Sequence, residues 1–139
     1  MKISAQLTNR QGDHQVLLRT AGREHALTIS PRPDGFGSSA NGGELLFLAL
    51  ATCYCNDIYR EARKRNIAVQ SVEVEVSGEF GAEGEPARNI SYHASVKANA
   101  PQAQILELLK HTDTVAEIQN TLRKGVPVVL TESLAHELS

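Results

Sequence analysis

The sequence predicts an α+β fold with a largely antiparallel sheet. Short segments of alternating polar and apolar residues lie on both sides of one long apolar helical segment. The expected order is three strands, a long helix, two strands, a helix pair and a last strand. A length of 139 residues fits one domain over residues 1–139. The 41% hydrophobic and 22% charged fractions are those of a folded globular chain rather than a disordered one.

The first third of the chain predicts an antiparallel meander. Residues 2–8, 15–20 and 25–30 alternate as strands do, and short polar or glycine-containing segments separate them. Residues 31–43 contain prolines and glycines at too many positions for regular structure. We therefore expect a loop there that leads into a helix.

A long helix is predicted from Glu44 onward. Residues 45–51 are apolar on every side, which is typical of a helix that is packed all round. The helix becomes charged after Tyr59, and Asn66 provides a C-terminal stop. Its apolar part is far shorter than the roughly 20 residues that span a bilayer, which excludes a transmembrane helix.

The second half predicts a hairpin, a helical region and a strand. Residues 67–80 and 90–98 alternate, and residues 81–86 turn the chain between them. Pro101 can begin a helical pattern that yields two short helices or one bent helix. Gly125 ends that pattern, and the valine-rich residues 126–130 predict a final strand.

Composition excludes several classes of function. The 14 Lys+Arg against 16 Asp+Glu give a net charge of −2, so nucleic acid and membrane surfaces are not expected partners. The five histidines do not have metal-ligand spacing, and the glycines do not form a phosphate-binding loop, so we expect no metal and no cofactor. Two cysteines and the absence of a signal-peptide pattern favour a cytoplasmic protein.

Cys53 and Cys55 are the residues that could carry chemistry. On a helix their side chains diverge by roughly 200°, so they can share neither a metal nor an unstrained disulfide. The apolar stripe of Cys55 predicts a core cysteine, whereas the stripe of Cys53 continues into Asp57 and Arg60. Cys53 is the better site candidate, although a buried, inert thiol is the common case for an unpaired cysteine.

The sequence around Cys53 resembles the central-helix motif of the OsmC/Ohr family. The matching residues are Asn41-Gly42-Gly43-Glu44-Leu45-Leu46-Phe47-Leu48-Ala49-Leu50-Ala51-Thr52-Cys53-Tyr54. The strand order, the valine-rich hairpin and Asn120-Thr121-Leu122 extend the resemblance along the chain. It implies a swapped homodimer in which sheets from both chains enclose the long helices. It also implies a thiol peroxidase that reduces organic hydroperoxides at the subunit interface.

The resemblance also implies roles for individual residues. Cys53 would attack the peroxide as a thiolate, Arg10 would supply the cation that lowers its pKa, and Glu44 would orient Arg10. Glu44 lies one residue later than the glutamate of the hydroperoxidases, whose place is Gly43. The second cysteine of the family is missing, since its place falls near Ala116.

Three functions remain open at this point. The first is a one-cysteine peroxidase that an external thiol reduces, with Leu46, Phe47 and Leu50 as an apolar slot for the substrate. The second is a dimer that binds an apolar small molecule without turnover, which the missing cysteine favours. The third is a structural protein without a ligand.

Overall fold

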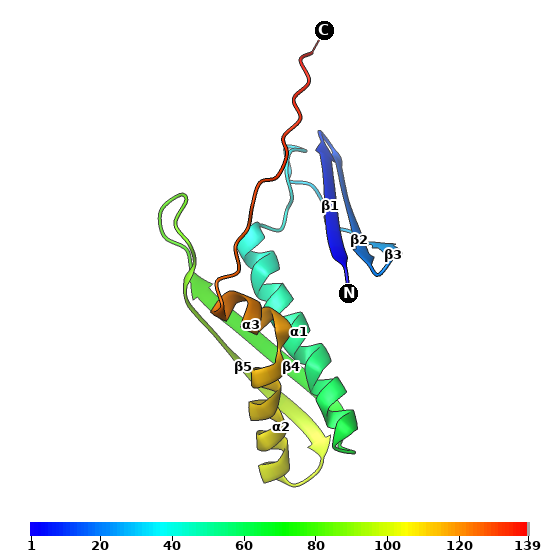
Figure 1. Ribbon diagram of the computed structural model, residues 1–139, viewed down its shortest axis with the longest axis vertical. Coiled ribbons are helices and arrows are strands. Elements are labelled where there is room, and N and C mark those ends of the chain that lie inside the picture. Colours follow the sequence, from blue (N-terminus) through cyan, green and yellow to red (C-terminus); the bar gives the residue numbers. More distant parts are fainter. Residues whose placement is uncertain (139) are drawn as a thin grey trace.

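The computed structural model describes residues 1–138, and it contains two antiparallel sheets and three helices (Figure 1). One sheet has the order β1–β2–β3 and consists of β1 (Ile3–Arg10), β2 (Asp13–Thr20) and β3 (Arg23–Ala26). The other pairs β4 (Ala68–Glu79) with β5 (Arg88–Asn99). Helix α1 (Gly42–Lys64) connects the sheets, and α2 (Gln102–Val115) and α3 (Glu117–Arg123) follow β5. The predicted α+β class is confirmed.

Both ends of α1 are fixed by local hydrogen bonds. At its start, Asn41 Oδ1 accepts from the Glu44 N–H at 2.8 Å and Glu44 Oε1 accepts from the Asn41 N–H at 2.9 Å, which is a capping box. At its end, Asn66 adopts a positive φ of 55°, and the Ile67 N–H donates to the Ala62 carbonyl. The predicted stop at Asn66 is therefore confirmed.

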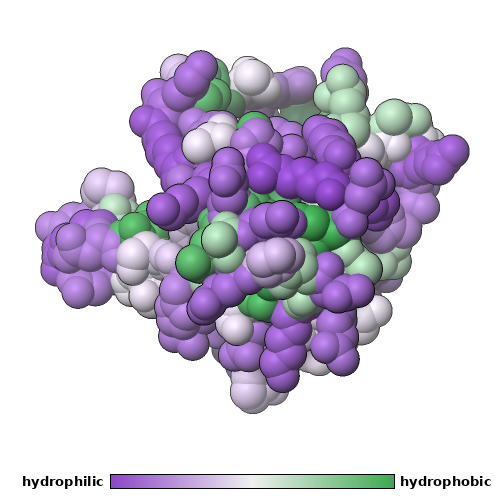
Figure 2. Space-filling view, turned by 90° about the horizontal axis from the view of Figure 1, so that it is seen from below, coloured by the Kyte–Doolittle hydropathy of each residue, from purple (hydrophilic) through white to green (hydrophobic). Residues whose placement is uncertain are grey.

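The core lies between the β4–β5 sheet and the helices α1 and α2. Ile58 and Leu108 are fully buried, and the ring of Tyr54 meets that of Tyr92 edge-on at 4.9 Å. Alternating apolar residues of β4 and β5 face this cluster, as the period-two pattern predicts; they are Val72 and Val74 on β4 and Tyr92, Ala94, Val96 and Ala98 on β5. Seen from below, hydrophobic residues show at the centre of a largely hydrophilic surface (Figure 2).

A buried carboxylate joins α1 to α2. The side chain of Glu61, which is 3% exposed, contacts Lys64 Nζ and Arg60 Nε at 2.9 Å each and His111 Nε2 at 2.8 Å. Hydrogen bonds from Lys64, Arg60 and His111 lower the pKa of Glu61 to about 2. A buried acid is thus stabilised in its charged form by three cationic or donor groups.

The sheet β1–β3 has little contact with the rest of the chain. Its strands pack on one another, and within residues 1–138 no helix or strand covers the exposed side chains of Ile3 and Leu7. The chain has a solvent-accessible area of 10,700 Å². Surface scaling gives about 7,100 Å² for a monomeric domain of this mass. The single chain therefore leaves uncovered a large surface that an isolated domain would bury.

Several sequence predictions are corrected by this arrangement. The third strand ends at Ala26 rather than at residue 30, and residues 126–130 form no strand but extend away from the helices (Figure 1). A strand needs a partner edge, and within residues 1–138 this segment pairs with none of the sheet edges. The apolar run of α1 is not packed all round, because Leu48 is 57% exposed and only Leu50 in that run is buried. Among residues 1–138, no helix combines the length and the hydropathy that crossing a bilayer requires.

Replacing Glu61 with Gln tests the buried contact between α1 and α2. We expect the free energy of unfolding at pH 7 to fall by about 1–3 kcal/mol, since hydrogen bonds to charged groups are lost. The folded pKa of Glu61 is below its ordinary value, so this stabilisation is complete above about pH 4.5 and is lost as the pH falls toward about 2.

The measurement is urea unfolding of both proteins between pH 7 and pH 2. The stability difference between them should shrink with acidification. Glu73→Gln, a change at an exposed position on β4, is the control and should have little effect. A pH-independent difference would show that the charge of Glu61 contributes nothing.

Candidate functional site

Cys53 lies on α1 where the start of α3 crosses it. Its half-buried Sγ is 3.6 Å from Asp57 Oδ2, one helical turn further along α1, and 3.7 Å from Glu117 Oε2 on α3. Both distances are within the range of hydrogen bonds that a thiol can donate. Cys53 is therefore the cysteine that meets charged side chains, as its stripe predicted.

Arg60 holds the two carboxylates in place. Its Nη1 lies 3.0 Å from Asp57 Oδ1 and 3.1 Å from Glu117 Oε1, while its Nε contacts Glu61 at 2.9 Å. Each of the first two acids thus contacts Arg60 through one oxygen and Cys53 through the other. The sulfur, two carboxylates and one guanidinium form a cluster, which we call the Cys53 cluster.

The cluster raises the pKa of the Cys53 thiol. Burial is the largest cause, and the charges of Asp57 and Glu117 add to it, while a main-chain hydrogen bond from Ile118 acts in the opposite direction. Burial and Glu117 also raise the pKa of Asp57, whereas the pKa of Glu117 is lowered, first by a main-chain hydrogen bond. At neutral pH Cys53 is therefore a protonated thiol, and the neighbouring carboxylate of Asp57 binds a proton more readily than an ordinary aspartate does.

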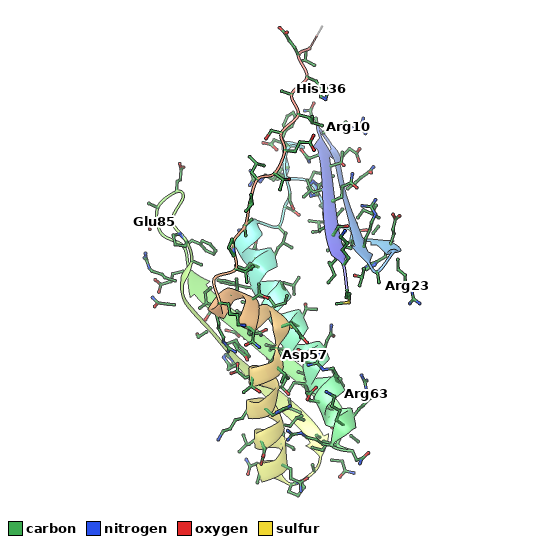
Figure 3. The ribbon with its side chains drawn as sticks, viewed as in Figure 1. Arg10, Arg23, Asp57, Arg63, Glu85 and His136 are labelled. Atoms are coloured by element: carbon green, nitrogen blue, oxygen red, sulfur yellow. The ribbon has the colours of Figure 1, made fainter. Side chains whose placement is uncertain are left out.

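The other two predicted site residues lie elsewhere in the chain. Arg10 is at the end of β1, where its 75% exposed side chain pairs with Asp13 at 3.7 Å. Figure 3 shows Arg10 at the tip of the β1–β3 sheet and Asp57 well along α1. The side chain of Glu44 takes part in the capping box of α1. Within residues 1–138, no described contact brings Arg10 or Glu44 to Cys53.

Two further features were not foreseen from the sequence. Cys55 is half-buried rather than part of the core, so that prediction is wrong. Glu117 was not singled out, although the resemblance pointed to its neighbour Ala116 as the place of the missing cysteine. Its carboxylate reaches Cys53 from a position 64 residues away in the sequence.

The Cys53 cluster has the composition of a small cation site. Ligand atoms of Cys53, Asp57 and Glu117 lie within 4.8 Å of one another. However, the guanidinium of Arg60 contacts both carboxylates and supplies the positive charge that a metal ion would bring. The geometry suits proton exchange between sulfur and oxygen at least as well as metal binding.

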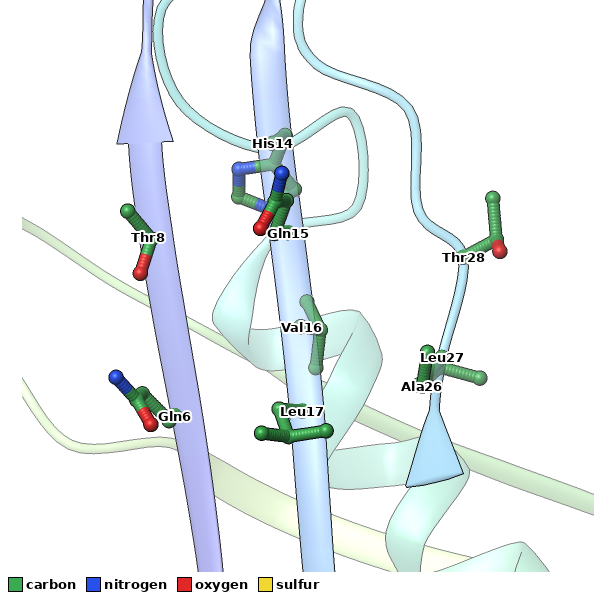
Figure 4. A pocket seen from close by; sticks show the side chains of 9 residues that line it. All are labelled: Gln6, Thr8, His14, Gln15, Val16, Leu17, Ala26, Leu27 and Thr28. Atoms are coloured by element: carbon green, nitrogen blue, oxygen red, sulfur yellow. The ribbon is translucent and has the colours of Figure 1, made fainter. Parts of the chain in front are cut away.

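Several hollows lie outside the cluster among residues 1–138. One of about 240 Å³ lies between α1, β5 and α3 and is partly open to solvent. A second hollow of about 340 Å³ lies on the β1–β3 sheet, between β1 and the chain that follows β3 (Figure 4). His14, in this second hollow, has a buried Nε2 without a hydrogen-bond partner. The exposed sheet therefore has a recessed face with an unused polar group.

Comparisons with known proteins agree on one family. The family described as OsmC-like protein matches residues 35–131, which is more than half of the chain. No curated protein matches the sequence.

Solved structures share the fold at low sequence identity. An OsmC-like protein from Mycoplasma pneumoniae is 20% identical, with a TM-score of 0.58 over 88% of this chain and 86% of that one. An organic hydroperoxide resistance protein OsmC from Legionella pneumophila is 21% identical, with a TM-score of 0.51 over 88% and 90%. One from Elizabethkingia anophelis with bound thiocyanate is 16% identical, with a TM-score of 0.52 over 88% and 89%.

Replacing Glu117 with Gln should lower the pKa of Cys53. The change removes one negative charge beside the sulfur and leaves Arg60 less neutralised, and both effects favour the thiolate. The rate of alkylation by iodoacetamide, measured against pH, should therefore rise at lower pH in the variant than in the wild type. Glu107→Gln, at an exposed position on α2, is the control. An unchanged profile would mean that Glu117 does not act on the thiol.

Proposed function

Because this chain belongs to the OsmC-like protein family, we propose that it reduces organic hydroperoxides with Cys53 as the nucleophile. The observation that carries the proposal is the contact of the Cys53 thiol with two carboxylates at the crossing of α1 and α3. We propose that residues 1–139 form one OsmC-like domain. We also propose that the protein acts in the cytoplasm, where thiol reductants keep cysteines reduced.

The reaction begins with proton transfer from sulfur. Asp57 accepts the thiol proton, and the thiolate attacks the terminal oxygen of the hydroperoxide R–O–OH. The S–O bond forms as the O–O bond breaks, so the cysteine becomes a sulfenic acid and the peroxide leaves as an alkoxide. Asp57 returns its proton to the alkoxide, which gives the alcohol R–OH. The raised pKa of Asp57 suits it to the first of these transfers.

Regeneration requires an external thiol. Cys55 points away from Cys53 on the same helix, and the place of the family's second cysteine falls near Ala116. A small or protein-bound thiol would attack the sulfenic sulfur, release water and leave a mixed disulfide. A second thiol would then restore Cys53 and carry away the disulfide.

In this proposal, Arg10 and Glu44 contribute to the site only when two chains assemble. We propose that the chain is a homodimer, because the β1–β3 sheet and the apolar side of Leu48 are uncovered in one chain. Arg10 is remote from Cys53 within its own chain, so a catalytic role for it requires delivery across the subunit interface. Glu44 would remain at the start of α1, next to that interface.

A dimer that binds a small molecule without turnover is the second candidate. The raised pKa of Cys53 favours it, since a thiol that stays protonated at neutral pH is a poor nucleophile. In that case Cys53 contributes packing and hydrogen bonds only. The two candidates differ in whether peroxide oxidises this cysteine in the folded protein.

Oxidation of the two cysteines separates these functions. With an organic hydroperoxide, we expect Cys53 alone to form a sulfenic acid, which persists until a thiol is added and is over-oxidised by excess peroxide. Cys53→Ser should abolish peroxide consumption, whereas Cys55→Ala should retain it and cost about 1 kcal/mol or more of stability. Mass spectrometry after trapping with dimedone locates the product. Oxidation of both cysteines only after unfolding, without turnover, would leave the binding function.

The oligomeric state tests the proposed dimer. Sedimentation velocity of the full chain at micromolar concentration should give the mass of two chains. Dilution should lead to unfolding together with dissociation, because the uncovered apolar surface is too large for a stable monomer. A folded monomer at micromolar concentration would contradict the proposal.

A further inference from the structure

The end of α1 and the adjoining part of α2 form a basic surface, which we call the basic end. Its members are Arg63, Lys64, Arg65, Lys110 and His111. Lys64 and His111 contact the buried Glu61. Among residues 1–138, no ion pair includes Arg63, Arg65 or Lys110. The chain as a whole has a net charge of −2, so this excess of positive charge is local to one end.

A hollow of about 600 Å³ opens to solvent between α1 and α2 at the basic end. Arg65, Lys110 and His111 supply its cationic and titratable lining. Leu106 also lines it and is 51% exposed. Glu107 is the one acid among the described lining residues. The hollow therefore combines an exposed apolar side chain with an excess of positive charge, which suits a partner that has both apolar and acidic groups.

The C-terminal segment, residues 131–138, has the complementary composition. It contains Glu132 and Glu137 and neither lysine nor arginine. Leu134 and Leu138 are 78% and 97% exposed, and no helix or strand includes them. No ion pair among residues 1–138 involves either glutamate. The apolar and acidic side chains that the hollow would accept are thus present, and unpartnered among the described residues, in this same chain.

The C-terminal segment and the basic end lie far apart in one chain. Figure 3 shows His136 near the tip of the segment and Arg63 near the end of α1, with the helices between them. The segment leaves α3 in the direction opposite to α2, so it would have to reverse its path to reach its own hollow (Figure 1). A second copy offers the same hollow without that reversal. In a twofold dimer the contact is reciprocal, so each segment would occupy the hollow of the other chain.

We propose that the C-terminal segment of one chain docks into the hollow between α1 and α2 of a second copy. Leu134 and Leu138 pack on Leu106, and the two carboxylates of the segment pair with Arg65 and Lys110. Exposed ion pairs contribute little each, so the leucines supply most of the affinity and the charges select the orientation. This contact rests on the homodimer proposed above and lies outside the surfaces that proposal uses, the β1–β3 sheet and the start of α1.

Zero-length cross-linking of the full-length protein tests which chains meet. Unlabelled and ¹⁵N-labelled chains are unfolded, mixed in equal amounts, refolded and treated with a carbodiimide, which joins an amine to a carboxylate in contact with it. After trypsin, residues 125–139 should be found joined through Lys110 to residues 98–123. About half of these products should combine a light and a heavy peptide, since two equal pools of chains pair at random. A link only between peptides of the same isotope, or no link, would overturn the proposal.

Paired charge reversals test the recognition. Lys110→Glu should speed the exchange of subunits between dimers several-fold, because it places like charges at the contact, and Glu132→Lys with Glu137→Lys should do the same. The three changes together restore the attraction and should return the rate toward that of the wild type. Glu83→Lys, at an exposed position in the turn between β4 and β5, is the control and should leave the rate unchanged. Native mass spectrometry of mixed light and heavy dimers measures the rate.

The outcomes separate this contact from the other proposals. Neither readout involves a reaction at Cys53, so the result is the same whether or not the protein reduces peroxides. A dimer without the cross-link would reject the docked segment alone, whereas a monomer would reject the dimer as well. Faster exchange in the single-side variants without recovery in the combined variant would also overturn the proposal, since it would show that the two sets of charges do not meet.

Discussion

The arrangement of the site depends on the ion pairs that the guanidinium of Arg60 forms with three carboxylates. The guanidinium binds Asp57 and Glu61 on its own helix and Glu117 on α3, and these acids would otherwise repel one another. Helix α3 has only seven residues and has little stability of its own. Its place against α1 is held by the buried Ala116 and by the bond from Gln119 to Leu50, and the partly exposed ion pair of Arg60 with Glu117 adds to them. The thiol environment and the neighbouring cavity both follow from that placement.

The charges of the Cys53 cluster keep the thiol of Cys53 protonated and place a base, the carboxylate of Asp57, beside it. Many reactive cysteines lie close to a cation that lowers the thiol pKa. Here the cation is on the far side of two carboxylates, and the sulfur meets their negative oxygens first. Reactivity in such a site depends on proton transfer within the cluster rather than on a permanent sulfur anion. Arg10 would change this balance if a second chain brought it to the sulfur.

The features predicted correctly from the sequence are those that depend on local contacts. The long helix α1, its stop at Asn66 and the valine pattern of β4 were visible because neighbours in sequence determine them. Glu117 was not, since nothing local signals that a residue 64 positions away will meet Cys53. The expected strand at residues 126–130 and the full packing of α1 require surfaces that one chain does not supply. The helical stripe indicated Cys53 together with Asp57 and Arg60, but only the tertiary structure shows that Glu117 joins them.

The isolation of the β1–β3 sheet has a kinetic consequence. Its strand pairings are all between strands adjacent in sequence, and such hairpins form in about 1–10 μs. Pairing of two chains is a bimolecular step, with typical rate constants of about 10⁵–10⁷ M⁻¹s⁻¹. If the chain dimerises as proposed, a newly made chain at micromolar concentration would thus wait for about 0.1–10 s with Ile3, Leu7 and residues 126–130 in water. During that interval these apolar side chains are open to chaperones and proteases, and a higher concentration of chains shortens the exposure.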